Sequence, residues 1–526
     1  MTDALVDWPY TSAALLAGAA LFATLLFALA RVGIPGIDRI SGNTVQRLAK
    51  NSAAPIVGQL ANRAVDLVFA AFVLRLLGAT ANGQYAVAVV AWLYLKTISD
   101  FGLSVLVTRE AAREPDRAGR LLGASTLLRI VVLVALVPPV ATYTVGGTHL
   151  FDLSRASAVA IGLLTLSLVP GSYTEAINSI FNAHERMELP AALNVATNLF
   201  RFCLGLAALV AGFGVVGLAL VALVTTTVST LAYHVALRHL GVRPEWRLTR
   251  TEARWLITLS WPLLLNSLLV NLFFRADVFI IQATRGDHAL GVYDAAYKFI
   301  NTVLLVPTYF TLAVFPILSR YATSDQTRLI DSYRLAIKFM LIIAWPMTLG
   351  TVALAPLLID ILGGAEFLPD SASALRVLIW FLPLSYVNGV TQYVLIAVDR
   401  QRSITGAFAA AVVFNLGANL LLVPRYGIYG AAAVTVATEV VIFGTLGVAV
   451  RRYVGRLNWS DIAFRPALAS VAMGAVLLLT WRLGAIPATI AACVAYAGAL
   501  VVSGAVGRQE ANIVLALLGR TRTAAS

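Results

Sequence analysis

Charged side chains interrupt several long apolar stretches in the first half of the chain. Arg63 and Asp66 lie three residues apart, Lys96 and Asp100 lie four apart, and Arg201 stands alone in its stretch. Within a helix, these spacings place each pair on one face. An ionisable group inside a membrane helix costs about 2.5–3.5 kcal/mol on insertion scales, so it usually faces a partner or a water-filled cavity. Cations that converge on one cavity from different helices would suit an anion, and phosphate best matches several basic donors.

The second half of the chain carries a similar set of charges. Arg275 and Asp277 lie near the end of one apolar stretch, Asp294 and Lys298 lie four residues apart in the next, and Glu439 lies in a later one. A carboxylate beside a cation can titrate or hold a sodium ion, and can thereby couple transport to an ion gradient. The alternative is that these are local ion pairs that only orient helices.

Two sets of candidate site residues follow from these positions. The predicted substrate-binding cations are Arg63, Lys96, Arg201, Arg275 and Lys298, and the predicted ion-coupling carboxylates are Asp66, Asp100, Asp277 and Asp294. Three other charged residues, Glu175, Lys338 and Arg376, lie near helix ends, where we expect them to extend to the membrane surface.

The sequence offers no other constellation typical of catalysis, nucleotide binding or metal binding. It contains no Walker A motif, no G-x-S-x-G elbow, no H-E-x-x-H and no C-x-x-C. The five His residues are scattered, and Cys203 and Cys493 both fall within apolar stretches. We therefore predict no cofactor, no metal site, no disulfide and no enzymatic activity.

The composition indicates a polytopic membrane protein of the all-α class. Of 526 residues, 59% are hydrophobic and only 12% are charged, which is too little polar surface for a soluble globule. Apolar windows of this length, without alternating polarity, match helices that cross a hydrocarbon core of about 30 Å. They lie near 11–30, 52–77, 85–107, 121–144, 156–178, 190–211, 215–237, 256–282, 291–315, 335–360, 373–397, 404–423, 428–450, 464–482 and 486–506. No connection between them is long enough to form a soluble domain.

The net charge of +13 is explained by topology. With the N-terminus outside, the inner connections carry most of the Arg and Lys residues, whereas the outer ones carry only Arg75, Arg155, Arg285, Arg425 and Arg482. This is the positive-inside pattern, and it argues against a nucleic-acid partner. Attraction to anionic lipid headgroups is expected as a by-product.

The first apolar segment, 11–30, resembles a cleavable signal because ALA at 28–30 could be a cleavage site. A signal needs a positively charged leading region, however, and this one has Asp3 and Asp7 with no Lys or Arg before Arg31. We therefore expect a retained helix that runs from outside to inside. A misassigned start codon is the main alternative.

Three short patterns recur at nearly one offset, which indicates a duplication. The frame Gly-x-Tyr-x-x-Ala occurs at 83–88 and 291–296, an acidic-Arg step at 185–186 and 399–400, and Gly-x-x-Gly at 214–217 and 427–430. The predicted domains are an extra N-terminal helix and inner linker (1–43), a six-helix N-lobe (44–240), a six-helix C-lobe (241–456), and two C-terminal helices with a cytoplasmic tail (457–526). Because six is even, the repeat is parallel.

Several stretches resemble the Wzx-type polysaccharide flippases of the multidrug/oligosaccharidyl-lipid/polysaccharide (MOP) exporter superfamily. The resemblance is carried by LAKNSAAPIVGQLANRAVDLVFAAFVLRLLGATANGQYAVA at 48–88, ISDFGLSVLVTREAAREPDRAGRLLG at 98–123, RADVFIIQATRGDHALGVYDAAYKF at 275–299 and FPILSRYA at 315–322. It covers roughly residues 44–506. Asp277 matches a family Asp, but Arg275 precedes it where many members place a basic residue after it.

The resemblance implies two helical bundles arranged as a V around a central, often cationic cavity. It implies alternating access and a cargo carried on an undecaprenyl-pyrophosphate-type lipid, moved from the inner to the outer leaflet of the cytoplasmic (inner) membrane for surface polysaccharide assembly. Ion coupling, a monomeric state, and partnership with a polysaccharide polymerase and assembly proteins are further expectations. The alternatives are a lipid II flippase or drug/cation antiporter of the same superfamily, a membrane glycosyltransferase or polysaccharide polymerase, and a structural scaffold.

Overall fold

The computed structural model describes residues 44–505 except 151 and 239, and these residues are helical throughout apart from short turns and connections. The predicted segment 11–30 lies outside the described residues. The helices are α3 (Thr44–Asp100), α4 (Leu103–Arg113), α5 (Ala118–Leu150), α6 (Arg155–Ala183), α7 (Glu188–Val210), α8 (Gly214–Arg238), α9 (Arg250–Val303), α10 (Leu305–Ser324), α11 (Gln326–Gly363), α12 (Asp370–Leu378), α13 (Phe381–Ala397), α14 (Gln401–Tyr453), α15 (Arg465–Thr480) and α16 (Ala485–Val502).

Three of these helices are far longer than a membrane is thick. At about 1.5 Å per residue, α3, α9 and α14 would each extend about 80 Å if they were straight. Each instead folds back at a glycine with positive φ: Gly78 (φ 73°), Gly286 (φ 79°) and Gly427 (φ 59°). A side chain at such a φ would be strained, so glycine is required there. With these turns, every predicted segment from 52–77 onward coincides with a helical span. Some continuous helical runs contain two such spans. Ten continuous runs among the described residues are long and apolar enough to cross a membrane.

The recurring sequence patterns mark equivalent turns. Gly78 and Gly286 are separated by 208 positions, the offset of the Gly-x-Tyr-x-x-Ala frames that follow them. The acidic-Arg steps also share a left-handed backbone, with φ of 56° at Glu185 and 58° at Asp399. Gly214 and Gly427, the first residues of the two Gly-x-x-Gly patterns, have φ of 55° and 59°. The repeat therefore preserves the turns that reverse the chain.

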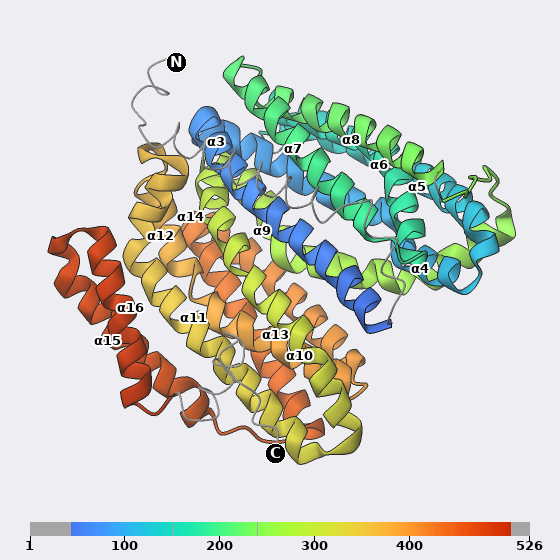
Figure 1. The fold of residues 1–526 in the computed structure, drawn as a ribbon. Helices are drawn as coiled ribbons and strands as arrows, with labels where there is room; N and C mark the ends of the chain where they lie inside the picture. Colours follow the sequence, from blue (N-terminus) through green and yellow to red (C-terminus); the bar gives the residue numbers. More distant parts are fainter. Residues whose placement is uncertain (1–43, 151, 239, 506–526) are drawn as a thin grey trace.

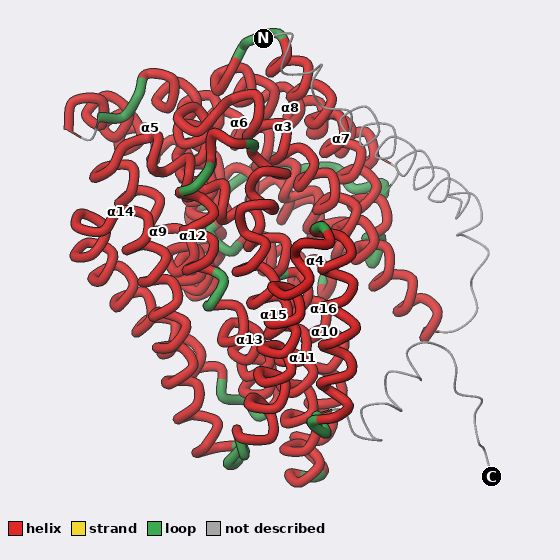
Figure 2. Tube along the Cα trace, turned by 90° about the vertical axis from the view of Figure 1, so that its left-hand side faces the viewer, coloured by secondary structure: helices red, strands yellow, loops and turns green. Residues whose placement is uncertain are grey.

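The helices form two bundles with α3 and α9 between them (Figure 1). Helices α3 and α4 pack with α5 to α8 as the N-lobe, while α9 packs with α10 to α14 as the C-lobe, and the two lobes diverge from the region where α3 and α9 pack against each other. Helices α15 and α16 pack on each other and on α11 at the outside of the C-lobe (Figures 1 and 2). This is the two-bundle, all-α architecture that the sequence predicted.

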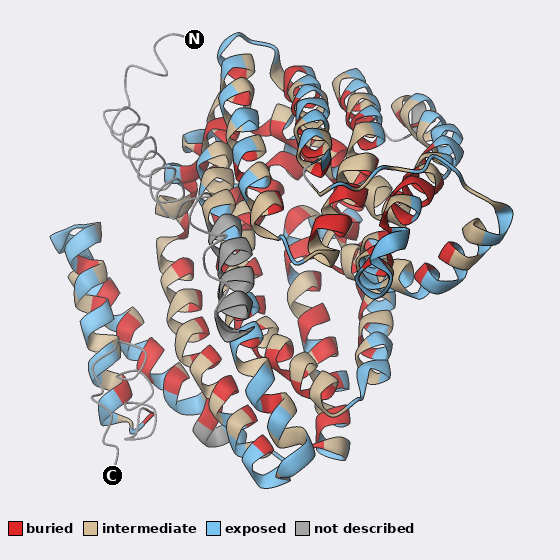
Figure 3. Ribbon diagram, turned by 45° about the vertical axis from the view of Figure 1, so that its right-hand side comes forward, coloured by how far each residue is buried: buried red, intermediate tan, exposed pale blue. Residues whose placement is uncertain are grey.

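The distribution of buried side chains follows the two-bundle arrangement. Buried residues face the interior of each bundle, and exposed ones cover the outside (Figure 3). The exposed residues include many large apolar side chains, such as Leu479 at 81% and Val502 at 90% exposure. In water such a surface would be unfavourable, whereas facing lipid it is expected, so the fold fits a bilayer as its solvent.

Candidate functional site

The two copies of the Gly-x-Tyr-x-x-Ala frame lie against each other. A Cβ added to Gly83 would lie 2.9 Å from the backbone nitrogen of Gly291, and one added to Gly291 would lie 2.9 Å from that of Gly83. Only glycines allow the two helices to approach so closely. The side chain of Asn82 donates a hydrogen bond to the carbonyl of Gly291 (3.1 Å). We call this contact between residues 79–84 of α3 and 287–294 of α9 the outer joint.

A charge cluster lies beside the outer joint. Asp294 is buried and accepts from Asn82 of the N-lobe (3.4 Å) and from Lys298 one turn along its own helix (3.1 Å). The guanidinium of Arg275 lies 3.8 Å from the same carboxylate and 4.4 Å from the ring of Tyr297. Two predicted cations, Arg275 and Lys298, therefore meet at a predicted carboxylate that also connects the lobes. The sequence predicted the pair of Asp294 and Lys298 from its spacing.

Asp277 is set apart from that cluster. Its side chain is buried, and it accepts a hydrogen bond from the hydroxyl of Tyr293 (2.6 Å). Its other oxygen, Oδ1, is buried without a hydrogen-bond partner among the described residues. Glu439 is also buried, and it accepts from the amide of Asn388 (2.6 Å). Both carboxylates are thus held by neutral donors.

A third set of charges lies in the N-lobe between α3 and α7. Arg201 contacts Asp66 at 3.2 Å and Asn198 at 2.6 Å, and Asn198 also donates to Asp66 (3.2 Å). Arg63 is exposed and makes no ion pair or hydrogen bond within the part of the chain that the structure describes. Asp66 therefore pairs across helices with Arg201, although the spacing in the sequence places Arg63 on the same face.

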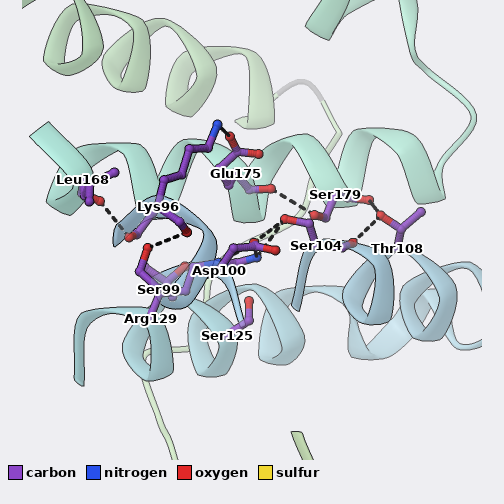
Figure 4. Close-up of polar contacts among 12 residues, drawn as sticks. Lys96, Ser99, Asp100, Ser104, Thr108, Ser125, Arg129, Leu168, Glu175 and Ser179 are labelled. Atoms are coloured by element: carbon purple, nitrogen blue, oxygen red, sulfur yellow. Dashed lines mark hydrogen bonds and ion pairs between the residues drawn. The ribbon is translucent and has the colours of Figure 1, made fainter. Parts of the chain in front are cut away.

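A cavity of about 480 Å³ lies between the lobes. Its N-lobe wall carries Lys96, Asp100 and Glu175, and its C-lobe wall carries side chains of α9. Lys96 contacts Glu175 of α6 at 2.8 Å (Figure 4), and both side chains stay about one-third exposed. The α9 wall is uncharged and polar, with Asn266, Ser267 and Asn271. We call this space the inter-lobe cavity.

Asp100, on the rim of the inter-lobe cavity, is held by a buried cation. Arg129 of α5 is only 1% exposed and lies 2.8 Å from Asp100, which also accepts from the hydroxyl of Ser104 (2.5 Å) (Figure 4). A buried guanidinium needs such a partner, since removal of the partner would leave an uncompensated charge. Asp100 is therefore engaged by α5, and Lys96 by α6, so neither pairs with the other.

Four of the five predicted cations thus fall into three clusters rather than one, and Arg63 belongs to none of them. Lys96 alone among these cations lines the inter-lobe cavity, while Arg275 and Lys298 surround Asp294 and Arg201 holds Asp66. The sequence-based selection left out Glu175, because its position near a helix end suggested a surface location. Its pairing with Lys96, 79 positions away, depends on helix packing. The α9 wall of the cavity could have been predicted from the polar residues Asn266, Ser267 and Asn271, which stand together in an otherwise apolar segment.

The inter-lobe cavity combines the groups needed to bind a polar, anionic molecule. The ammonium of Lys96 provides three donors for an anionic oxygen, while the exposed amide and hydroxyl of Asn266 and Ser267 can exchange hydrogen bonds with hydroxyl groups. Lys96 lies about 27 Å along the helix from the turn at Gly78, so the cavity lies toward the opposite ends of the helices, which the charge pattern predicts to be the inner ends. No group of three or more His, Cys, Asp or Glu side chains among the described residues could hold a metal ion.

Comparisons with known proteins identify the family and the fold of this chain. The profile of the polysaccharide biosynthesis protein family matches residues 48–322, just over half of the chain, and the profile named MatE matches residues 262–421. A comparison with curated proteins found no match. Among solved structures, the lipid II flippase MurJ in an inward closed conformation aligns with a TM-score of 0.72 at 15% identity, covering 88% of this chain and all of that one.

Multidrug transporters of the MATE family also share the fold. An inward-facing MATE transporter of the MOP superfamily aligns with a TM-score of 0.60 at 17% identity, covering 76% of this chain and 98% of that one. A mutant of the Vibrio cholerae MATE transporter VcmN aligns with a TM-score of 0.52 at 17% identity, covering 77% of this chain and 97% of that one. The chain has the fold of the MOP superfamily of transporters, and it belongs to the polysaccharide biosynthesis protein family.

Proposed function

We propose that this protein is a flippase for a lipid-linked oligosaccharide carried on an undecaprenyl-pyrophosphate-type lipid. It moves this cargo from the inner to the outer leaflet of the cytoplasmic membrane, by alternating access, for surface polysaccharide assembly. The family match to polysaccharide biosynthesis supports this substrate class, and the shared fold with a lipid II flippase supports the type of transport.

The observation that carries the proposal is the inter-lobe cavity. Lys96 provides the one cation of its lining, on the N-lobe wall, and the α9 wall provides amides and a hydroxyl that suit a glycan. We assign the phosphate to Lys96 and the sugar hydroxyls to Asn266, Ser267 and Asn271. Because the cavity lies toward the inner ends of the helices, it suits a substrate loaded from the inner leaflet.

Glu175 sets a condition on substrate binding. It contacts Lys96 at 2.8 Å, so a phosphate must displace this carboxylate before the ammonium is available. An exposed ion pair contributes only about 0–1 kcal/mol, so a charged phosphate can compete with it. Glu175 therefore acts as an internal counter-ion that keeps the empty cavity from holding an unpaired cation.

Flipping of a fluorescent lipid-linked oligosaccharide in proteoliposomes tests the proposal. A hydrogen bond to a charged group is worth about 1.5–3 kcal/mol, so Lys96→Gln should reduce the apparent affinity at least about tenfold. Arg328→Gln is the matched control, because Arg328 is 69% exposed and pairs locally with Asp325. Equal transport by wild type and Lys96→Gln would contradict the assignment of Lys96. Absence of flipping by the wild type would contradict the function itself.

The same assay tests ion coupling. We propose that the carboxylates Asp66, Asp100, Asp277 and Asp294 include the coupling group, and Asp277 is the one with a buried, unpartnered oxygen. Flipping should then respond to an imposed pH or sodium gradient. If neither gradient changes the rate in the wild type, these carboxylates have structural roles.

A drug/cation antiporter is the second candidate, because two carboxylates, Asp100 and Glu175, line the inter-lobe cavity beside a single cation. The MatE profile match agrees with it. Proton-driven uptake of an organic cation into the same proteoliposomes would favour this function. Its absence, together with flipping of the lipid-linked substrate, would favour the flippase.

A further inference from the structure

A second cavity lies inside the C-lobe, away from the joint between the lobes. It has a volume of about 230 Å³ and is bounded by α11, α13, the end of α14 and the connection that follows α14. A water molecule occupies about 30 Å³ in the liquid, so this space holds about seven groups of that size, in the range of a segment of hydrocarbon chain. None of the predicted transport residues lines it.

The lining of this cavity is amphipathic. Phe443, Val448 and Leu457 provide apolar walls, while the charged residue is Arg451 near the end of α14. Trp459 packs edge-on against Phe443, with ring centroids 5.1 Å apart. We call the apolar part of the cavity, between these walls, the slot. The combination of an apolar slot, an arginine and a tryptophan is typical of the membrane interface.

Glycines create the open space along α14. A Cβ added to Gly444 or Gly447 would meet nothing within 4 Å, so the helix leaves room for a ligand beside its backbone. Gly455 has φ 151° and lies at the turn after α14, from which the chain returns with Leu457 and Trp459 over the slot. Gly444 lies about 10 Å along the helix from Arg451, and this distance sets the length of chain that the slot can cover.

The slot opens toward lipid and ends in positive charge. Val448 on its rim is 68% exposed on the apolar outer surface. Arg451 is exposed and makes no ion pair or hydrogen bond with the residues that the structure describes. The neighbouring Arg452 and Arg456 are also exposed, at the end of α14 that the charge pattern places inside. Basic pockets between helices on this side suit anionic lipid headgroups.

We propose that the C-lobe binds an anionic phospholipid of the inner leaflet at this cavity. Arg451 contacts the headgroup phosphate, and one acyl chain lies along Gly447 and Gly444 under Trp459. The site is separate from the inter-lobe cavity and does not depend on the transported substrate. The bound phospholipid comes from the surrounding bilayer, and it contacts both α14 and the connection that leads to α15.

Native mass spectrometry of the delipidated full chain, titrated with phosphatidylglycerol or phosphatidylcholine, tests the proposal. We expect the wild type to retain phosphatidylglycerol in preference to phosphatidylcholine. Loss of one basic contact lowers affinity about fivefold, so Arg451→Gln should bind phosphatidylglycerol about fivefold more weakly. Gly447→Leu fills the slot and should abolish the preference. If Gly447→Leu is not monodisperse, Gly444→Leu takes its place with the same expectation.

Two matched controls separate this site from general attraction of lipid to a basic surface. Arg452→Gln removes the adjacent charge, which does not line the cavity, and Gly474→Leu adds the same side chain to α15, where a Cβ also meets nothing within 4 Å. Both should bind like the wild type. Equal binding of the two lipids by the wild type, or equal weakening by Arg452→Gln and Arg451→Gln, would overturn the proposal.

Discussion

Replacement of Gly83 by Ala tests whether the lobes must meet backbone to backbone at the outer joint. The added Cβ would lie 2.7 Å from the carbonyl carbon of Asp287 and closer still to its oxygen, whereas real Cβ atoms stay beyond 3.0 Å. Both opposing atoms belong to a backbone, so no side-chain rotation relieves the overlap. The two helices must separate, and the hydrogen bond from Asn82 to Gly291 must lengthen.

The cost of this change follows from the overlap. Overpacking of a close contact typically costs about 1–3 kcal/mol. Applied to an equilibrium between joined and separated lobes, that cost lowers the ratio of joined to separated molecules about 5- to 150-fold. The proposed alternating access requires both states, so transport should fall as the joined state becomes rarer, while the amount of folded protein stays unchanged.

Cysteine cross-linking across the outer joint measures the joined state directly. The side chains of Thr80 and His288 lie 3.3 Å apart, so Thr80→Cys with His288→Cys should cross-link readily in membranes. Adding Gly83→Ala should slow this reaction, by at least about fivefold where the separated state predominates. Gly146→Ala is the control, because its Cβ meets nothing within 4 Å. Unchanged cross-linking and unchanged transport in Gly83→Ala would refute the role of the outer joint.

Three further predictions concern the charges and the start of α9. Asp100→Asn leaves a buried guanidinium without its counter-ion, so thermal unfolding in detergent should show a free energy of unfolding lower by about 3–5 kcal/mol. Asp325→Asn, in an exposed pair, should lower it by under about 1 kcal/mol. Equal losses in the two variants would contradict this reading. Thr249→Ala removes the capping box of α9 and should cost about 1 kcal/mol in the same assay, and no loss would show that the cap is dispensable. Glu175→Gln frees Lys96 and should tighten binding of the lipid-linked substrate up to about fivefold, whereas weaker binding would show that the carboxylate itself contacts the substrate.

The fold could be predicted closely from the sequence because it depends on local patterns. Apolar length defines each span without any knowledge of packing, and the positive-inside distribution predicts its direction. The recurring glycine frames could be found as well, and they proved to lie next to the reversing turns at Gly78 and Gly286. The sequence could not show that the frames contact each other, because that contact joins residues 208 positions apart.

The candidate site was less predictable, because spacing along a helix reports only local pairs. Asp294 and Lys298 do pair as their spacing indicates. Lys96 and Asp100 have the same spacing, yet each contacts a different helix, at Glu175 and Arg129. The partner of each charged side chain depends on which helix faces pack against each other. Apolar stretches of similar composition do not predict this packing.

The outer joint also shows how a duplicated chain becomes asymmetric. At the offset of 208, the positions that correspond to Asp294 and Lys298 are Ala86 and Val90, so the C-lobe copy alone carries the charges. Asp294 accepts from Asn82 of the opposite lobe, and a buried carboxylate without such donors would be costly. Separation of the lobes therefore removes one of the donors to that carboxylate, whereas Lys298 on the same helix moves with it. Opening at the outer joint thus changes the environment of Asp294. The equivalent position in the N-lobe is Ala86, which carries no charge that the opening could affect.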